Sequence, residues 1–111
     1  MSDRCPFCTI YIESRDKILA ANEHAFAVYD INPQSKGHVL IITKRHVPSY
    51  FEMKPEEVQA MFEMLRHMRS ELKKQHNPSG FNIQVNDGKA AGQIIFHTHM
   101  HLIPRYGETV E

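Results

Sequence analysis

The stretch His97-Thr98-His99-Met100-His101 carries a histidine at every second position and continues into Leu102-Ile103-Pro104-Arg105. In an extended strand successive side chains point to opposite faces of the sheet, so this spacing places all three imidazoles on one face. Imidazole can act as a metal ligand, base, acid or nucleophile near neutral pH. We therefore expect a strand at this place, and we expect it to carry the chemistry of the protein.

The segments before this stretch predict an antiparallel α+β fold. Residues 24–30 and 38–43 are rich in apolar and β-branched side chains, and the short loop between them favours two antiparallel strands. From Pro55 the apolar residues recur at steps of three and four, which predicts a helix to about His76. Residues 81–86 alternate again and predict a third strand. The loops are too short for parallel crossovers, so we expect one long helix packed on an antiparallel sheet.

Length and charge limit the possible partners. The 111 residues, 41% of them hydrophobic, fit a single domain over residues 1–111 whose small core would gain from self-association. Lysine and arginine total 13 and so do aspartate and glutamate, which disfavours binding to duplex nucleic acid or to an anionic membrane. No run approaches the roughly 18 apolar residues that a membrane span needs, and the N-terminus lacks the pattern of a secretory signal. We therefore expect a cytoplasmic protein.

The two cysteines stand together as Cys5-Pro6-Phe7-Cys8. In a reducing compartment this spacing indicates metal binding or redox exchange rather than a structural disulfide. A redox pair of the thioredoxin type would follow a strand and open a helix, whereas no strand is expected before Cys5. Zinc is therefore favoured over redox exchange, and two thiols without a function remain the third possibility.

The residues alone leave three kinds of site open for the histidines. A pair of histidines on a strand can hold a catalytic zinc with an open coordination position. The same imidazoles could also act directly on a phosphate. We therefore consider a metal-centred hydrolase, a histidine-based phosphate enzyme and a non-catalytic metal site.

A resemblance narrows this choice. His97-Thr98-His99-Met100-His101-Leu102-Ile103 resembles the His-x-His-x-His-x-x signature of the histidine triad family of nucleotide hydrolases and transferases. The similarity implies the α+β histidine triad fold, which commonly forms a two-fold homodimer. It covers nearly the whole chain in the same order and is similar to the bacterial-type branch that includes dinucleoside polyphosphate hydrolases. The segments that carry this wider similarity are residues 5–8, 22–24, 30, 37–42, 44–46, 81–82 and 86–93.

The resemblance implies a covalent mechanism. His99, the middle histidine, would attack the α-phosphorus of a purine nucleotide conjugate, either a dinucleoside polyphosphate or a nucleoside phosphoramidate, and carry the nucleotidyl group. Water would then release the nucleoside monophosphate. By the same analogy His101 would hydrogen-bond near the transferred phosphate, and His38 would support the triad from the neighbouring strand.

The resemblance also implies a nucleotide pocket. Asp30 would accept hydrogen bonds from the ribose, although from sequence alone it could simply begin a turn. Asn86-Asp87-Gly88 likewise reads as an ordinary turn without the resemblance. The residues assigned to the base are Phe7, Ile10, Val28 and Ile31, and those assigned to phosphate are Asn86, Gly92 and Gln93.

A structural zinc ion is the implied cofactor. In the branch with a Cys-x-x-Cys motif, the cysteines join the histidine of the Lys-x-His segment and the first triad histidine. The corresponding residues here are Cys5, Cys8, His46 and His97. Two thiolates and two imidazoles form a closed tetrahedral set, which leaves His99 free for chemistry.

Two residues depart from the family pattern. Many relatives place serine or threonine two residues after the loop glycine, where this chain has Ile94, so we expect lower phosphoramidase activity or a changed leaving-group preference. Thr98 is less apolar than the family norm, which we expect to affect packing alone. No extended C-terminal tail that shapes specificity is expected after Tyr106. The alternative to an enzyme is a nucleotide-binding or zinc-organised interaction protein without turnover.

Overall fold

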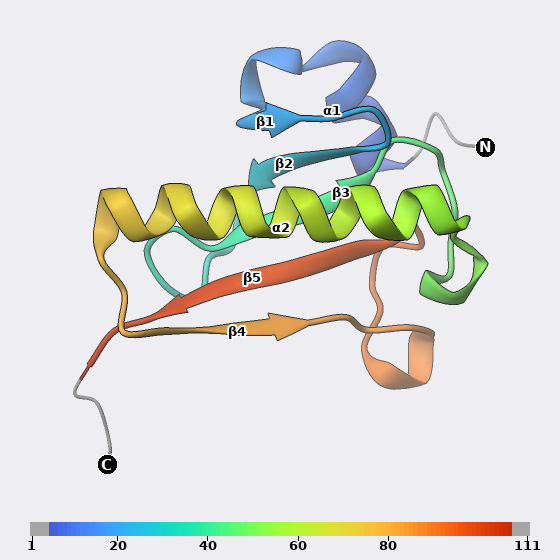
Figure 1. Cartoon of the computed structure of the whole chain (residues 1–111). Helices are drawn as coiled ribbons and strands as arrows, with labels where there is room; N and C mark the ends of the chain where they lie inside the picture. The colour runs from blue at the N-terminus through green and yellow to red at the C-terminus, as the bar shows by residue number, and fades with distance from the viewer. Residues whose placement is uncertain (1–4, 108–111) are drawn as a thin grey trace.

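The apolar run Val39–Thr43 forms β3, every residue of which is buried. This strand lies in the middle of a five-stranded sheet in the computed structural model, which describes residues 5–107 (Figure 1). All neighbouring strands pair antiparallel in the order β1-β2-β3-β5-β4, so the expected α+β class is confirmed. The other strands are β1 Ala20–Ala21, β2 Ala25–Tyr29, β4 Gly80–Gln84 and β5 His99–Arg105.

The long helix α2 covers one face of the sheet (Figure 1). It spans Pro55–His76, as predicted, because proline is favourable at the first helical position and Asn77 ends it in the left-handed region at φ 48°. Its apolar stripe packs on side chains of β2, β3 and β5. Within residues 5–107 no helix is both long and apolar enough to span a membrane. The buried residues of this stripe are Ala60, Met61, Met64, Leu65, Met68 and Leu72.

A short N-terminal helix covers the opposite face of the sheet. This helix, α1, spans Pro6–Glu13 and packs Phe7 and Ile10 against the alternate residues of β2 and β3, among them Val28 and Leu40. The local sequence pattern predicted neither α1 nor the two-residue β1. The fold thus has two apolar layers, one beneath α2 and one beneath α1, and the second adjoins the histidines.

The histidine-bearing strand begins later than its spacing suggests. Only His99 and His101 lie in β5, where they pair with Ile42 and Leu40 of β3. His97 precedes the strand, so the prediction of three histidines along one strand face is wrong. The chain bends there because the Thr98 amide and hydroxyl both donate to the Val47 carbonyl, at 2.7 Å each.

An ion pair anchors the segment after β3 to the start of α2. The Arg45 guanidinium donates two hydrogen bonds of 2.8 Å to the Glu57 carboxylate, which also accepts the Lys54 amide at 2.8 Å. The Glu57 side chain is 4% exposed and that of Arg45 is 43% exposed. The Arg45 hydrogen bonds lower the pKa of Glu57 from 4.5 to about 2. This pair fixes the segment that holds His46.

Replacing Glu57 with glutamine should therefore destabilise the protein in a pH-dependent way. A lowered folded-state pKa contributes stability that is full above the unfolded value of 4.5 and is lost as pH falls through about 2. We expect the free energy of unfolding to fall by about 1–2 kcal/mol near neutral pH. The loss is no larger because water screens the half-exposed Arg45. Urea unfolding should show that the difference in free energy of unfolding between wild type and Glu57→Gln decreases as the pH is lowered.

The matched control is Glu63→Gln, which alters an exposed glutamate on the same helix. It should shift the urea midpoint little at any pH. A gap for Glu57→Gln that stays constant from neutral to acidic pH would contradict the assigned ion pair.

Candidate active site

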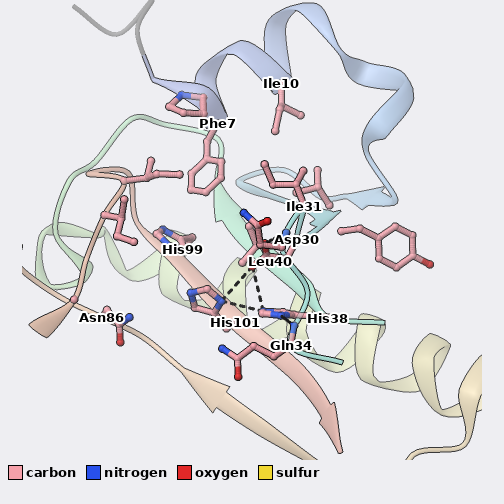
Figure 2. Close-up of a pocket in the computed structure, with 17 residues that line it drawn as sticks. Phe7, Ile10, Asp30, Ile31, Gln34, His38, Leu40, Asn86, His99 and His101 are labelled. Carbon is pink, nitrogen blue, oxygen red and sulfur yellow. Dashed lines mark hydrogen bonds and ion pairs between the residues drawn. The ribbon is translucent and has the colours of Figure 1, made fainter. Parts of the chain in front are cut away.

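A cavity of about 390 Å³ lies over the α1 face of the sheet (Figure 2). Its walls come from α1, β2, β3, β5 and two connecting segments, one between β2 and β3 and one between β4 and β5. It brings together ten of the residues that the sequence analysis assigned to the nucleotide or to catalysis. These are Phe7, Ile10, Val28, Asp30, Ile31, His38, Asn86, Gly92, His99 and His101.

The hydrogen bond of His99 fixes its tautomer. Its Nδ1 lies 2.7 Å from the carbonyl oxygen of His97, and a carbonyl can only accept, so Nδ1 carries the proton. The Nε2 atom therefore keeps a free lone pair. Burial lowers the pKa of His99, which favours the neutral ring. Phe7 packs edge-on against this ring, with centroids 4.9 Å apart. His99 is thus a neutral imidazole with one nucleophilic nitrogen.

His38 and His101 form a hydrogen-bonded chain behind His99 (Figure 2). The backbone amide of Gln34 donates to His38 Nδ1 at 3.0 Å, so the proton of a neutral His38 is on Nε2. That Nε2 lies 3.0 Å from His101 Nδ1, which must accept, so His101 carries its own proton on Nε2. Burial lowers the pKa of both rings. The chain therefore leaves the His101 Nε2–H as a donor for a ligand.

Asp30 lies beside both of these histidines. Its Oδ2 is 3.3 Å from His38 Nε2 and 3.8 Å from His101 Nδ1, distances at which the three groups could hold a metal ion. The hydrogen bond from the Gln34 amide disfavours metal binding here, because it places the proton of His38 on Nε2 and a ligand nitrogen must be unprotonated. The other oxygen of Asp30, Oδ1, accepts the Asn32 amide at 2.9 Å and keeps a second lone pair for a ligand.

A second cluster joins Cys5, Cys8, His46 and His97, whose ligand atoms all lie within 4.8 Å of one another. The Nδ1 of His97 is 3.3 Å from the Cys5 sulfur and 3.6 Å from the Cys8 sulfur, and His46 Nδ1 is 3.3 Å from the Cys8 sulfur. The Nε2–H of His97 donates to the Thr43 carbonyl at 2.7 Å, which leaves Nδ1 unprotonated towards the thiols.

The electrostatics of this cluster suit a bound dication. Burial and the neighbouring Cys5 raise the pKa of the Cys8 thiol to about 11, whereas a metal ion would favour the thiolates. Burial lowers the pKa of His97 to about 4, so its ring is neutral, as a ligand must be. A set of two sulfur and two nitrogen donors fits tetrahedral zinc.

Gln93 differs from its expected role. It is 5% exposed and does not line the cavity. Its side chain accepts from the Gly88 amide at 2.7 Å and donates to the carbonyls of Pro48 at 2.8 Å and Ile95 at 3.1 Å. Its own amide donates to Gly88, so the expected phosphate contact is wrong for this geometry. Gln93 holds the loop together instead, because a buried amide must satisfy its hydrogen bonds.

One feature of the cavity was not foreseen. Gln34, whose amide sets the His38 tautomer, stands in a turn without any sequence pattern that marks it. Gly92, the expected phosphate residue, adopts φ 92° and lines the cavity. Its positive φ strains any other residue, which explains the glycine.

Comparison with known proteins agrees with this arrangement. The HIT domain matches residues 12–108. The chain belongs to this family. A HIT family protein from Bacillus anthracis is 41% identical with a TM-score of 0.87, covering 96% of this chain and 76% of that chain. A zinc-bound histidine triad family protein from Mycobacterium smegmatis is 34% identical with a TM-score of 0.82, covering 95% of this chain and 77% of that chain.

Two curated HIT relatives carry names of hydrolases. The adenylylsulfatase of Arabidopsis thaliana is 41% identical over 106 residues, which is 95% of this chain and 54% of the relative. The bis(5′-adenosyl)-triphosphatase of Dictyostelium discoideum is 33% identical over 91 residues, which is 82% of this chain and 61% of the relative. This chain thus spans only a little over half the length of these two enzymes.

Proposed function

We propose that this HIT protein hydrolyses purine nucleotide conjugates at the α-phosphate through a covalent nucleotidyl-His99 intermediate. The observation that carries this proposal is the free Nε2 of His99 within the cavity. HIT relatives named as an adenylylsulfatase and a bis(5′-adenosyl)-triphosphatase support nucleotide hydrolysis at the level of the family. Conjugates that release AMP, such as dinucleoside polyphosphates or nucleoside phosphoramidates, are the substrate class.

The cavity supports one orientation of the nucleotide. Ile10, Val28 and Ile31 offer apolar surface at the end near α1, where a purine base would pack. Asp30 follows β2 at the same end and would accept the ribose hydroxyls. The α-phosphate would then reach His99, with the His101 Nε2–H and the Asn86 side chain as donors.

The positions of the protons on His99 and His101 indicate which atom acts in each step of the reaction. His99 Nε2 bonds to phosphorus while the bond to the leaving group breaks, and the Nδ1–H bond to the His97 carbonyl stabilises the charged ring that forms. The His101 Nε2–H stabilises charge on the phosphate or the departing atom. A water molecule then bonds to phosphorus and the bond to Nε2 breaks, which releases the nucleoside monophosphate.

We also propose that Cys5, Cys8, His46 and His97 hold a structural zinc ion. The unprotonated His97 Nδ1 and the mutual distances of the four donors support this assignment. A bound zinc ion would crosslink these four residues, whose two sulfur and two nitrogen atoms would supply its four ligands. It would fasten α1, which forms one wall of the cavity, to the residue that precedes β5.

A homodimer through β4 is our third proposal. This strand is an edge of the sheet, and it adjoins a groove that α2 lines with Phe62. Phe62 is 57% exposed and Ile83 of β4 is 55% exposed. A second copy that places its own β4 alongside would pair the open edge and cover both side chains about a two-fold axis.

Replacing His99 with alanine should abolish AMP release from adenosine 5′-phosphoramidate and from diadenosine tetraphosphate. Loss of a covalent nucleophile lowers kcat by on the order of 10⁴-fold or more. The two substrates are to be compared by chromatographic assay of AMP. His67→Ala, which alters an exposed histidine on α2, should keep full activity. A wild-type protein that binds AMP but releases none from either conjugate would instead indicate a binding protein.

The purified protein should hold about one zinc ion per chain, measured by elemental analysis. Bound zinc should shield both thiols from alkylation, and its removal by a chelator should lower the melting temperature because α1 loses its crosslink. His46→Ala should weaken zinc retention, whereas His24→Ala should not. Equal alkylation rates with and without zinc would contradict the site.

Ile83→Lys should convert a dimer to a monomer, because a charge on the paired edge opposes strand addition. Sedimentation equilibrium of wild type and variant measures the mass directly. Ile12→Lys, at a position on α1 that is 70% exposed, is the matched control and should leave the dimer intact. A monomeric wild type would contradict the interface.

A further inference from the structure

The end of β5 and the residue after it hold the loop that precedes His38. Residues 104–106 each form a hydrogen bond with this loop, which connects β2 to β3. The Ser35 hydroxyl donates to the Pro104 carbonyl at 2.5 Å, the Arg105 guanidinium to the Gln34 side-chain carbonyl at 3.1 Å, and the Tyr106 hydroxyl to the Lys36 carbonyl at 2.7 Å. None of residues 104–106 lines the cavity, so these contacts act on the loop.

This loop contains the backbone amide that decides the tautomer of His38. The Gln34 amide donates to His38 Nδ1, so a neutral His38 ring keeps its proton on Nε2 and donates to His101 Nδ1. Figure 2 shows Gln34 beside His38. If the amide moved away, His38 could carry its proton on Nδ1, and His101 could then place its own proton on Nδ1. The cavity would lose the His101 Nε2–H as a donor.

Arg105 connects this loop to the strand on the other side of β5. Its Nε donates to the Asn82 side chain of β4 at 2.7 Å, while its Nη2 donates to Gln34. Because the guanidinium is planar and rigid, the bond to Asn82 fixes the direction in which Arg105 reaches the loop. Arg105 thus holds Gln34 in place from the sheet.

The charge of Arg105 also favours the neutral form of His38. Burial is the main cause of the lowered pKa of this ring, the Asp30 carboxylate opposes the shift, and the positive charge of Arg105 adds to it. The other titratable group in contact with the ring is His101. A protonated His38 would carry hydrogens on both nitrogens, and its Nδ1–H would face the N–H of Gln34. Arg105 therefore opposes the protonation that would break this hydrogen bond.

We propose that Arg105 is a positioning residue for the reaction, because it holds the Gln34 amide on His38. The hydrogen-bonded chain then keeps the His101 Nε2–H available to the phosphate. The inference rests on the proposed function, since this donor serves a phosphate that reacts at His99. Arg105 itself does not line the cavity, so its loss should lower the rate of the reaction far more than it weakens nucleotide binding.

The test replaces Arg105 with alanine, which removes both its charge and its hydrogen bond to the loop. Arg105 is exposed, so the variant should fold. Lys74→Ala is the matched control, because it removes a positive charge from an exposed side chain on α2, on the other face of the sheet.

Three quantities are measured for each protein. Two are the kcat of AMP release from adenosine 5′-phosphoramidate and the Kd of AMP. The third is the tautomer of His38, obtained by ¹⁵N NMR of labelled imidazoles, because a nitrogen that carries a proton and one that carries a lone pair resonate far apart. The His38 signals are identified by their absence from the spectrum of His38→Gln.

Wild type and Lys74→Ala should show a single His38 tautomer with its proton on Nε2. In Arg105→Ala both tautomers should be populated, and kcat should fall on the order of tenfold while the Kd of AMP changes little. Unchanged His38 signals or an unchanged kcat in Arg105→Ala would overturn the inference. An equal fall of kcat in Lys74→Ala, or a rise in the Kd of AMP as large as the fall in kcat, would do the same.

Failure of the proposed function gives a different result. A wild-type protein that releases no AMP would overturn the reaction at His99. The ¹⁵N signals of His38 need no turnover, so they would still show whether Arg105 holds the tautomer.

Discussion

The buried imidazole of His97 is the constraint on which the site depends. Its Nε2–H is bound to the Thr43 carbonyl of β3, and its Nδ1 faces the sulfur atoms of Cys5 and Cys8. Its backbone carbonyl accepts the proton of His99. One residue therefore connects the sheet to the N-terminal helix and also sets the tautomer of the nucleophile. Since the ring is fully buried, none of these contacts competes with water.

This arrangement separates the metal cluster from the chemistry. The cysteines, His46 and His97 lie around one centre, while His99 and His101 face the cavity. The proton of His99 is held on Nδ1, so Nε2 keeps its lone pair, and among residues 5–107 no hydrogen bond engages it. The four candidate metal ligands can thus anchor α1, which forms one wall of the cavity. His99 Nε2 remains free to attack phosphorus.

The sequence predicted those parts of the fold that local patterns determine. The bounds of α2 follow from Pro55 and the apolar period, and the resemblance to the histidine triad family indicated the residues that line the cavity. The predictions that failed concern features that depend on contacts between residues distant in the sequence. The start of β5 was misplaced because Thr98 bonds to Val47, and α1 was missed because its apolar residues serve a layer that only the sheet creates. The orientation of Gln93 depends on three distant hydrogen bonds that no spacing records.

The most direct test of the account is to trap the intermediate. The wild-type protein is mixed with adenosine 5′-phosphoramidate, quenched within the first turnover and digested for mass spectrometry. We predict an adenylyl group on Nε2 of His99, because this cavity nitrogen is unprotonated and keeps its lone pair, whereas the Nε2 of His101 carries a proton. Turnover that releases AMP with no nucleotide on His99, or with the nucleotide on another residue, would contradict the account.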